Sequence, residues 1–146
     1  MKDVKFNFNR LSRGVRNNNP GNIRRGSAKW FGLYHLQTDS EFCQFEKMEY
    51  GVRALLVLLR TYYIKYNCNT IKKVISRFAP SSENNTNNYI KYVCDFMFYP
   101  SDDVRLSLNT CLTLAIPIMI YESGFRMTSS ELHKIISKYN LCKSDI

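Results

Sequence analysis

A helical repeat of apolar residues between Tyr50 and Tyr66 constrains the fold more than any other feature of the chain. Apolar side chains recur there at spacings of three and four residues, so they line one face of an α-helix. A chain of 146 residues is long enough to build a core around that face. We therefore expect a mostly helical fold with this helix at its centre. The repeating positions are Val52, Leu55, Leu56, Leu59, Tyr62, Tyr63 and Tyr66.

Further helices are predicted where a capping residue precedes an apolar repeat and where proline or glycine ends one. Proline inside a helix removes a hydrogen bond and bends it. The predicted helices are 71–78 after Thr70, 87–98 after Thr86, 106–122 with a kink at Pro117 and a stop at Gly124, and 131–140 after a capping box of Thr128 and Glu131.

The N-terminal third of the chain has turn-forming and aromatic-rich segments in place of a helical repeat. Residues 16–27 are dense in Asn, Gly and Pro, which is typical of turns. Residues 28–46 hold two aromatic-rich runs around Thr38, Asp39 and Ser40, and this pattern predicts a small β-hairpin. The expected fold class is α+β and mostly α-helical. We expect one domain over residues 1–146, with a lead-in at 1–15, the turn segment and hairpin at 16–46, and a helical body at 47–146.

The formal net charge of +9 favours a polyanionic partner, which could be nucleic acid, an anionic membrane face or a cell wall. The basic residues are scattered, so we expect no nucleic acid partner. The N-terminus lacks the apolar stretch of a secretory signal, and no run of about 20 apolar residues predicts a membrane span. We expect a protein made in the cytoplasm, and most simply a monomer.

The chain has five cysteines and two histidines, without a C-x-x-C motif. An odd number of cysteines in this arrangement indicates free thiols in a protein made in a reducing cytosol. The same inventory makes a zinc site improbable. We therefore expect neither a metal nor another cofactor.

Glu122 is the strongest candidate for chemistry. It ends an apolar helix, directly before Ser123 and Gly124. Apolar neighbours and the partial negative charge of a helix C-terminus both favour its protonated form. A carboxyl group with a raised pKa can act as a general acid on a glycosidic oxygen. The alternative is a frayed helix end with an exposed glutamate.

Glycoside hydrolysis often uses a second carboxylate, and the predicted hairpin supplies Asp39 and Glu41. The polar residues that turns ordinarily carry are the alternative explanation for both, and mechanisms with one carboxylate also exist.

Sugar sites combine aromatic platforms with amide groups. The candidates for sugar contact are Asn18, Asn22, Trp30, Tyr34 and Tyr89, although core packing is an alternative for the aromatic residues and turn formation for the asparagines.

Several segments together resemble the lysozyme-like glucosaminidase class of peptidoglycan hydrolases. The resemblance implies a lysozyme-like fold, a peptidoglycan substrate and a catalytic acid at Glu122. The matching segments are "YESGF" (121–125), "NNPGNI" (18–23), "WFG" (30–32), "FCQF" (42–45) and "TNNY" (86–89). The Glu-Ser-Gly motif comes first in that class and nearly last here. The order therefore suggests a circular permutation, which is tolerated when termini lie close together.

The chain from about Gly14 to Val93 is also similar to a set of phage-type proteins labelled as virion components or lysozymes. Their pattern runs R-N-N-N-P-G-N-I-R, W-x-G, D-x-x-F-x-x-F, G-x-R-A and A-P-x-x-E-N-x-T-x-x-Y. Glu83 lies in the last of these motifs and is the rival to Glu122. Its position before a helix lowers the expected pKa, which suits a stabilising carboxylate better than an acid.

The sequence thus predicts an enzyme that cleaves the β-1,4 glycan of peptidoglycan as a muramidase, glucosaminidase or lytic transglycosylase. It would act at the bacterial cell wall as a phage lysin or virion component. The alternative is a non-catalytic virion or wall-binding protein that keeps the fold. A small nucleic-acid-binding domain is the more distant rival.

Overall fold

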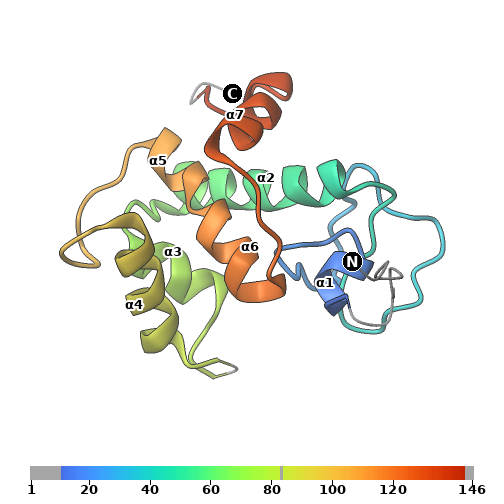
Figure 1. Ribbon diagram of the computed structural model, residues 1–146, viewed down its shortest axis with the longest axis horizontal. Helices are drawn as coiled ribbons and strands as arrows, with labels where there is room; N and C mark the ends of the chain where they lie inside the picture. The colour runs from blue at the N-terminus through green and yellow to red at the C-terminus, as the bar shows by residue number, and fades with distance from the viewer. Residues whose placement is uncertain (1–10, 83, 144–146) are drawn as a thin grey trace, which may run out of the picture.

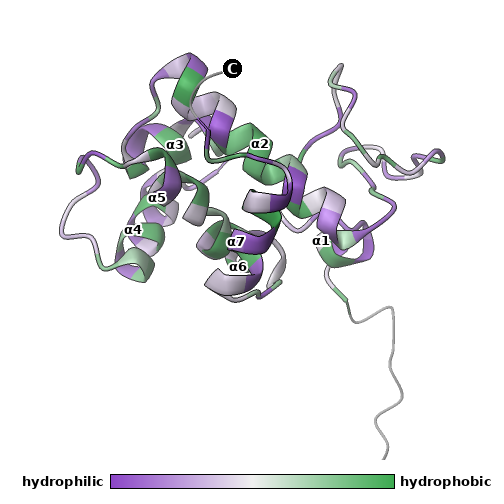
Figure 2. Ribbon diagram, turned by 90° about the horizontal axis from the view of Figure 1, so that it is seen from above, coloured by the Kyte–Doolittle hydropathy of each residue, from purple (hydrophilic) through white to green (hydrophobic). Residues whose placement is uncertain are grey.

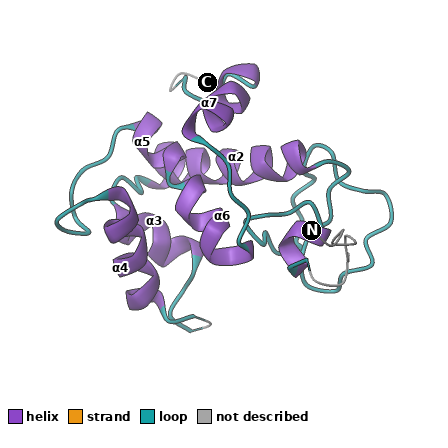
Figure 3. Ribbon diagram, in the orientation of Figure 1, coloured by secondary structure: helices purple, strands orange, loops and turns teal. Residues whose placement is uncertain are grey.

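The computed structural model describes residues 11–82 and 84–143. This part of the chain contains helices and loops without a regular β-strand (Figure 3). The prediction of a mostly helical fold is confirmed. The helices are α1 (Arg13–Arg16), α2 (Met48–Tyr66), α3 (Ile71–Phe78), α4 (Thr86–Met97), α5 (Leu108–Thr113), α6 (Ala115–Ser123) and α7 (Ser129–Lys138).

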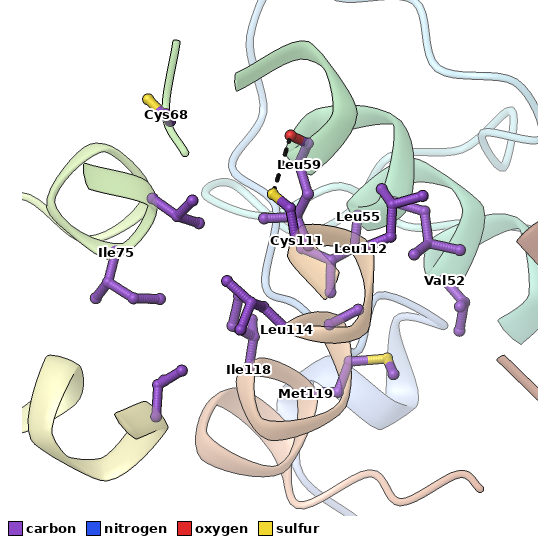
Figure 4. Packing of buried hydrophobic residues seen from close by; sticks show 14 of the residues in the cluster. Val52, Leu55, Leu59, Cys68, Ile75, Cys111, Leu112, Leu114, Ile118 and Met119 are labelled. Atoms are coloured by element: carbon purple, nitrogen blue, oxygen red, sulfur yellow. Dashed lines mark hydrogen bonds between the residues drawn. The ribbon is translucent and has the colours of Figure 1, made fainter. Parts of the chain in front are cut away.

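Helix α2 runs through the middle of the molecule, and α3, α5, α6 and α7 all contact it (Figure 1). Along α2, α3 and α4 hydrophobic and hydrophilic residues alternate in the manner of amphipathic helices (Figure 2). The buried side of α2 meets α5 and α6 in the core, where Cys111 and Met119 pack near Leu55 and Leu59 (Figure 4). The apolar repeat of α2 therefore organises the fold as its sequence predicts.

The predicted β-hairpin at residues 28–46 forms only a short antiparallel pairing without regular strands, in which the Tyr34 N–H donates to the Gln44 carbonyl and the Glu46 N–H to the Gly32 carbonyl, both at 2.9 Å. The described chain has two isolated antiparallel bridges here, Arg24 with Phe42 and Leu33 with Phe45. The Gln44 side chain instead accepts from the Thr38 backbone N–H at 2.6 Å. Side-chain bonds of this kind satisfy backbone groups that a strand ladder would otherwise pair, so aromatic patterning alone overstated the strand content.

Two predicted helix starts are confirmed by their caps. The Thr70 hydroxyl accepts from the Lys73 backbone N–H at the start of α3. At α7, Thr128 and Glu131 form the complete capping box, with each side chain bonded to the other residue's backbone N–H. These bonds are local, which is why the sequence predicts them.

The start of α4 differs from the prediction by one residue. Asn85 is the N-cap, and its side chain accepts from the Asn88 backbone N–H. The Thr86 hydroxyl donates to the Ala79 carbonyl oxygen instead. Thr86 therefore ties the helix to the end of α3, a contact that requires the tertiary structure.

The predicted helix 106–122 is broken at Leu114 into α5 and α6, three residues before the proline at which the sequence predicts a kink. Pro117 has no N–H to donate to the Thr113 carbonyl, and its ring would crowd that carbonyl in a continuous helix. The break places Pro117 in the first turn of α6, where proline is tolerated. Gly124 ends α6 at φ 74°, as predicted.

The five cysteines are free thiols. Cys43, Cys68, Cys94 and Cys111 are buried, and Cys142 is exposed. Burial raises the pKa of the Cys111 thiol to about 12, so this residue acts as a small apolar side chain in the core.

Candidate functional site

A cleft of about 550 Å³ lies between the N-terminal loops and the helical body. Several parts of the chain line it: the loop from Asn22 to Trp30, the loop at Phe42, one side of α2, the region from the end of α3 to Asn84, and the end of α6. Half-buried Trp30 is part of the wall. The lining residues are Asn22, Ile23, Arg24, Gly26, Ser27, Ala28, Trp30, Phe42, Leu58, Tyr62, Phe78, Ala79, Pro80, Asn84 and Glu122.

Glu122 occupies the cleft wall at the C-terminal end of α6 and is half-buried. Burial raises its pKa above the ordinary value of 4.5. Tyr89, Asn22 and the Arg24 charge act in the opposite direction but do not cancel the effect of burial. Glu122 is therefore positioned, inside a cleft, to keep its proton at a higher pH than an exposed glutamate does.

The N-terminal turn and the end of α6 are joined by several hydrogen bonds. The Asn22 side-chain amide donates to the Glu122 carbonyl at 3.0 Å and to its Oε1 at 3.3 Å. The Ser123 hydroxyl donates to the Pro20 carbonyl at 2.8 Å, and the Ser12 hydroxyl donates to the Ser123 carbonyl at 2.7 Å. Segments that lie about a hundred residues apart in the chain thus build one site.

The other asparagines of the turn have structural contacts. The Asn18 amide donates to the Phe45 carbonyl at 3.1 Å, and Asn18 is outside the cleft lining. Asn19 is fully buried, and its amide donates to the Ile23 and Cys43 carbonyls at 2.9 Å. The predicted sugar contact is therefore possible for Asn22 and is not supported by the position of Asn18.

Tyr89 lies beneath the cleft, not in it. Its side chain is 1% exposed, and its ring stacks on Tyr121 with 3.8 Å between centroids. The Tyr89 hydroxyl has no hydrogen-bond partner of regular geometry among the described residues, yet it is near enough to the Glu122 carboxyl to lower its pKa. Direct sugar contact by Tyr89, which the sequence suggested, is incompatible with this burial.

Asp39 is held by a network of hydrogen bonds within the N-terminal loops. Arg13 donates to both of its carboxylate oxygens, at 2.6 and 2.7 Å, and the Asn17 amide donates at 2.9 Å. These bonds hold the pKa of Asp39 well below its usual range. Asp39 does not line the cleft. Its bonds to Arg13 and Asn17 tie the loop to α1.

The remaining predicted residues are also dispersed. Glu41 is exposed beside Arg13 and Arg24, with nitrogen to oxygen distances of 3.6 and 3.7 Å. Tyr34 is 42% exposed and does not line the cleft. Glu83 lies outside the described residues. Of the predicted site residues, the structure brings together Glu122, Asn22 and Trp30 in the cleft, with Tyr89 behind them.

Sequence reasoning missed several cleft residues. Arg24 lines the wall, and its charge acts on Glu122. Its position two residues after Asn22 was the available signal. Phe42, Tyr62 and Asn84 come from three separate segments, and no local pattern places them at one cleft.

Two other features of the described chain bear on function. No three His, Cys, Asp or Glu side chains gather there in a way that could hold a metal ion. No helix in residues 11–82 and 84–143 is both long and apolar enough to cross a bilayer.

Comparison with known proteins finds similarity to a bacteriophage protein. No family model matches the chain. Over 91 residues the chain is 44% identical to Protein P5 of Pseudoalteromonas phage PM2. The match covers 60% of this chain and 57% of that protein's length. The chain is therefore similar to a phage protein over somewhat more than half of either sequence.

Proposed function

We propose that this protein cleaves the β-1,4 glycan strands of peptidoglycan, with Glu122 as the proton donor. The observation that carries the proposal is a half-buried carboxyl group with a raised pKa on the wall of a cleft. Such a group can protonate the glycosidic oxygen as its bond breaks. Trp30 offers an apolar ring to a sugar in the same cleft.

Glu122 would act in both halves of the reaction. It first gives its proton to the leaving sugar oxygen, and the resulting carboxylate then takes a proton from the attacking hydroxyl group. Among the described residues that line the cleft, Glu122 is the one carboxylate. This supports a scheme in which the substrate's acetamido group or a positioned water replaces the second carboxylate. Water would give hydrolysis, and a hydroxyl of the substrate would give an anhydro product.

The proposed fold is lysozyme-like in circularly permuted order. Its support is the contact between the Asn18–Ile23 segment and the Tyr121–Phe125 segment, made by Asn22 and Glu122. In the enzymes that the sequence resembles, these two motifs follow one another. Here folding brings them together across most of the chain.

The test is the Glu122→Gln variant against purified cell walls, with loss of turbidity as the measurement. Glutamine keeps the shape and cannot donate a carboxyl proton, so we expect the rate to fall by about 100-fold or more. Glu41→Gln is the matched control because Glu41 is exposed and outside the cleft lining. Full activity of correctly folded Glu122→Gln would refute the assignment, and mass spectrometry of wild-type products would identify the bond cut.

A second candidate is a phage virion component that binds the wall without cutting it. The similarity to Protein P5 of phage PM2 favours a phage protein. Wild-type protein that sediments with walls but releases no soluble product would support this candidate. A monomeric state and the absence of nucleic acid or membrane partners remain predictions.

A further inference from the structure

The outward face of α4 carries a shallow hollow of about 440 Å³. Its residues recur at helical spacing, so they form one stripe along the helix. The opposite face of α4 is buried in the core through Tyr89, Ile90, Val93 and Cys94. We call the five residues that line the hollow the α4 hollow: Asn88, Lys91, Tyr92, Asp95 and Phe96.

The α4 hollow combines aromatic and polar groups. Phe96 is 39% exposed, and its ring lies 6.3 Å from that of half-buried Tyr92. Lys91 and Asp95 form an ion pair at 3.3 Å beside them, and the Asn88 amide is exposed. A purely structural solvent face of a helix is polar. A carbohydrate suits this surface: the flat rings can pack against the apolar faces of sugars, and the neighbouring amide and charged groups can bind their hydroxyl groups.

A series of contacting tyrosine rings joins this hollow to α6, the helix that bears Glu122. The Tyr92 ring lies 5.2 Å from that of Tyr121, which in turn stacks on Tyr89. Tyr121 is 46% exposed and directly precedes Glu122. Helices α4 and α6 are in contact. The exposed aromatic surface therefore continues from the α4 hollow to the end of α6 that bears the cleft.

We propose that the α4 hollow is a second binding site for the glycan strand, with Phe96 and Tyr92 as its sugar platforms. The inference rests on the proposed function, because the ligand is the same polysaccharide. A strand held outside the cleft keeps the protein on its polymer between cleavages. It raises the effective concentration of substrate at Glu122 without taking part in bond cleavage.

The experiment measures binding to purified peptidoglycan sacculi by sedimentation, with Glu122→Gln as the parent so that the polymer stays intact. Phe96→Ala is compared with Phe98→Ala. Phe98 follows the same helix and is 93% exposed, but it is outside the hollow. We expect Phe96→Ala to weaken binding about five- to tenfold and Phe98→Ala to leave it unchanged. Phe96→Tyr should bind like the parent, and Asn88→Ala should weaken binding without touching an aromatic ring.

Parental binding by Phe96→Ala and Asn88→Ala would overturn the proposal. Equal losses in Phe96→Ala and Phe98→Ala would also overturn it, since that result means nonspecific adhesion. With Glu122 intact, Phe96→Ala should cleave a short soluble glycan fragment of peptidoglycan at the wild-type rate, and a lower rate would place the residue's effect in the cleft instead. If the wild type cleaves nothing, the proposed activity fails, while the sedimentation result still decides the binding site.

Discussion

Asn22 and Glu122 stand 100 positions apart in the chain, and the Asn22 amide donates to both the backbone carbonyl and the carboxyl group of Glu122. Asn22 adopts φ 50°, a left-handed conformation that asparagine tolerates better than most residues. The turn thus directs an amide at the one carboxyl group of the described cleft lining. This contact makes the N-terminal turn part of the candidate site.

The Asn22→Ala variant tests that contact. Alanine removes the hydrogen bonds and is strained at positive φ, so we expect a loss of about 1–3 kcal/mol in the free energy of unfolding. The pKa of Glu122 should rise further, because Asn22 lowers it in the wild type. Carboxyl carbon NMR titration measures this pKa directly. Asn18→Ala is the matched control, since Asn18 has φ 51° and its side-chain amide also donates to a backbone carbonyl, that of Phe45. It should destabilise the fold without moving the Glu122 titration, and equal pKa shifts in both variants would contradict the assignment.

Stability should depend on pH through Glu122. Its folded pKa is raised, so the folded state holds a proton that the unfolded chain has lost above pH 4.5. The contribution is present below that value and is lost as pH rises through the folded pKa. Glu122→Gln cannot lose a proton, and we expect it to be more stable than wild type near neutral pH.

Urea unfolding from pH 4 to pH 8 measures the difference between the two proteins. The advantage of Glu122→Gln should grow as pH rises above 4.5 and level off once Glu122 has ionised in the folded protein. A difference that stays constant would mean that Glu122 titrates alike in the folded and unfolded states.

The Tyr89→Phe variant removes a buried hydroxyl that has no regular hydrogen-bond partner in the described structure. Because an unsatisfied buried hydroxyl is costly, its removal should leave the free energy of unfolding at pH 4, where Glu122 holds its proton, unchanged or raise it by up to about 1 kcal/mol. The pKa of Glu122 should rise, since Tyr89 lowers it. Thermal unfolding and the same NMR titration test both effects.

Tyr92→Phe provides the comparison for Tyr89. The Tyr92 hydroxyl donates to the Pro117 carbonyl at 3.1 Å, so its loss should cost about 1 kcal/mol. Glu122 should titrate as in the wild type. A Tyr89→Phe variant that loses more stability than Tyr92→Phe would show that the Tyr89 hydroxyl is well bonded.

Asp39→Asn separates a structural from a catalytic role. The network around Asp39 lowers its pKa, so its stabilisation is present above the ordinary value of 3.8 and is lost as pH falls below it. At neutral pH we expect Asp39→Asn to lose about 2–3 kcal/mol of unfolding free energy while the folded fraction keeps its activity on cell walls. Glu41→Gln should change stability by less than about 1 kcal/mol, because its ion pairs are exposed. Inactive Asp39→Asn of wild-type stability would instead make Asp39 the second catalytic carboxylate.

The parts of the fold that depend on local interactions were predictable. The apolar repeat of α2, the Thr70 cap, the capping box of Thr128 and the glycine stop at Gly124 each involve residues within one or two turns of each other. The predicted hairpin is reduced to isolated bridges, because the side chains of Gln37 and Gln44 bond backbone N–H groups that longer strands would pair. Pattern alone does not distinguish such a loop from a short strand pair.

The sequence by itself determined that the chain is helical, that Glu122 ends an apolar helix and that the asparagine cluster forms a turn. Only the tertiary structure decided that the turn contacts Glu122 and that Tyr89 is buried beneath the cleft. It also decided that Arg13 binds the Asp39 carboxylate. The reason is physical. Periodicity and caps report interactions over a few residues, whereas the desolvation and hydrogen bonding that tune a carboxyl group come from whatever segments folding brings beside it.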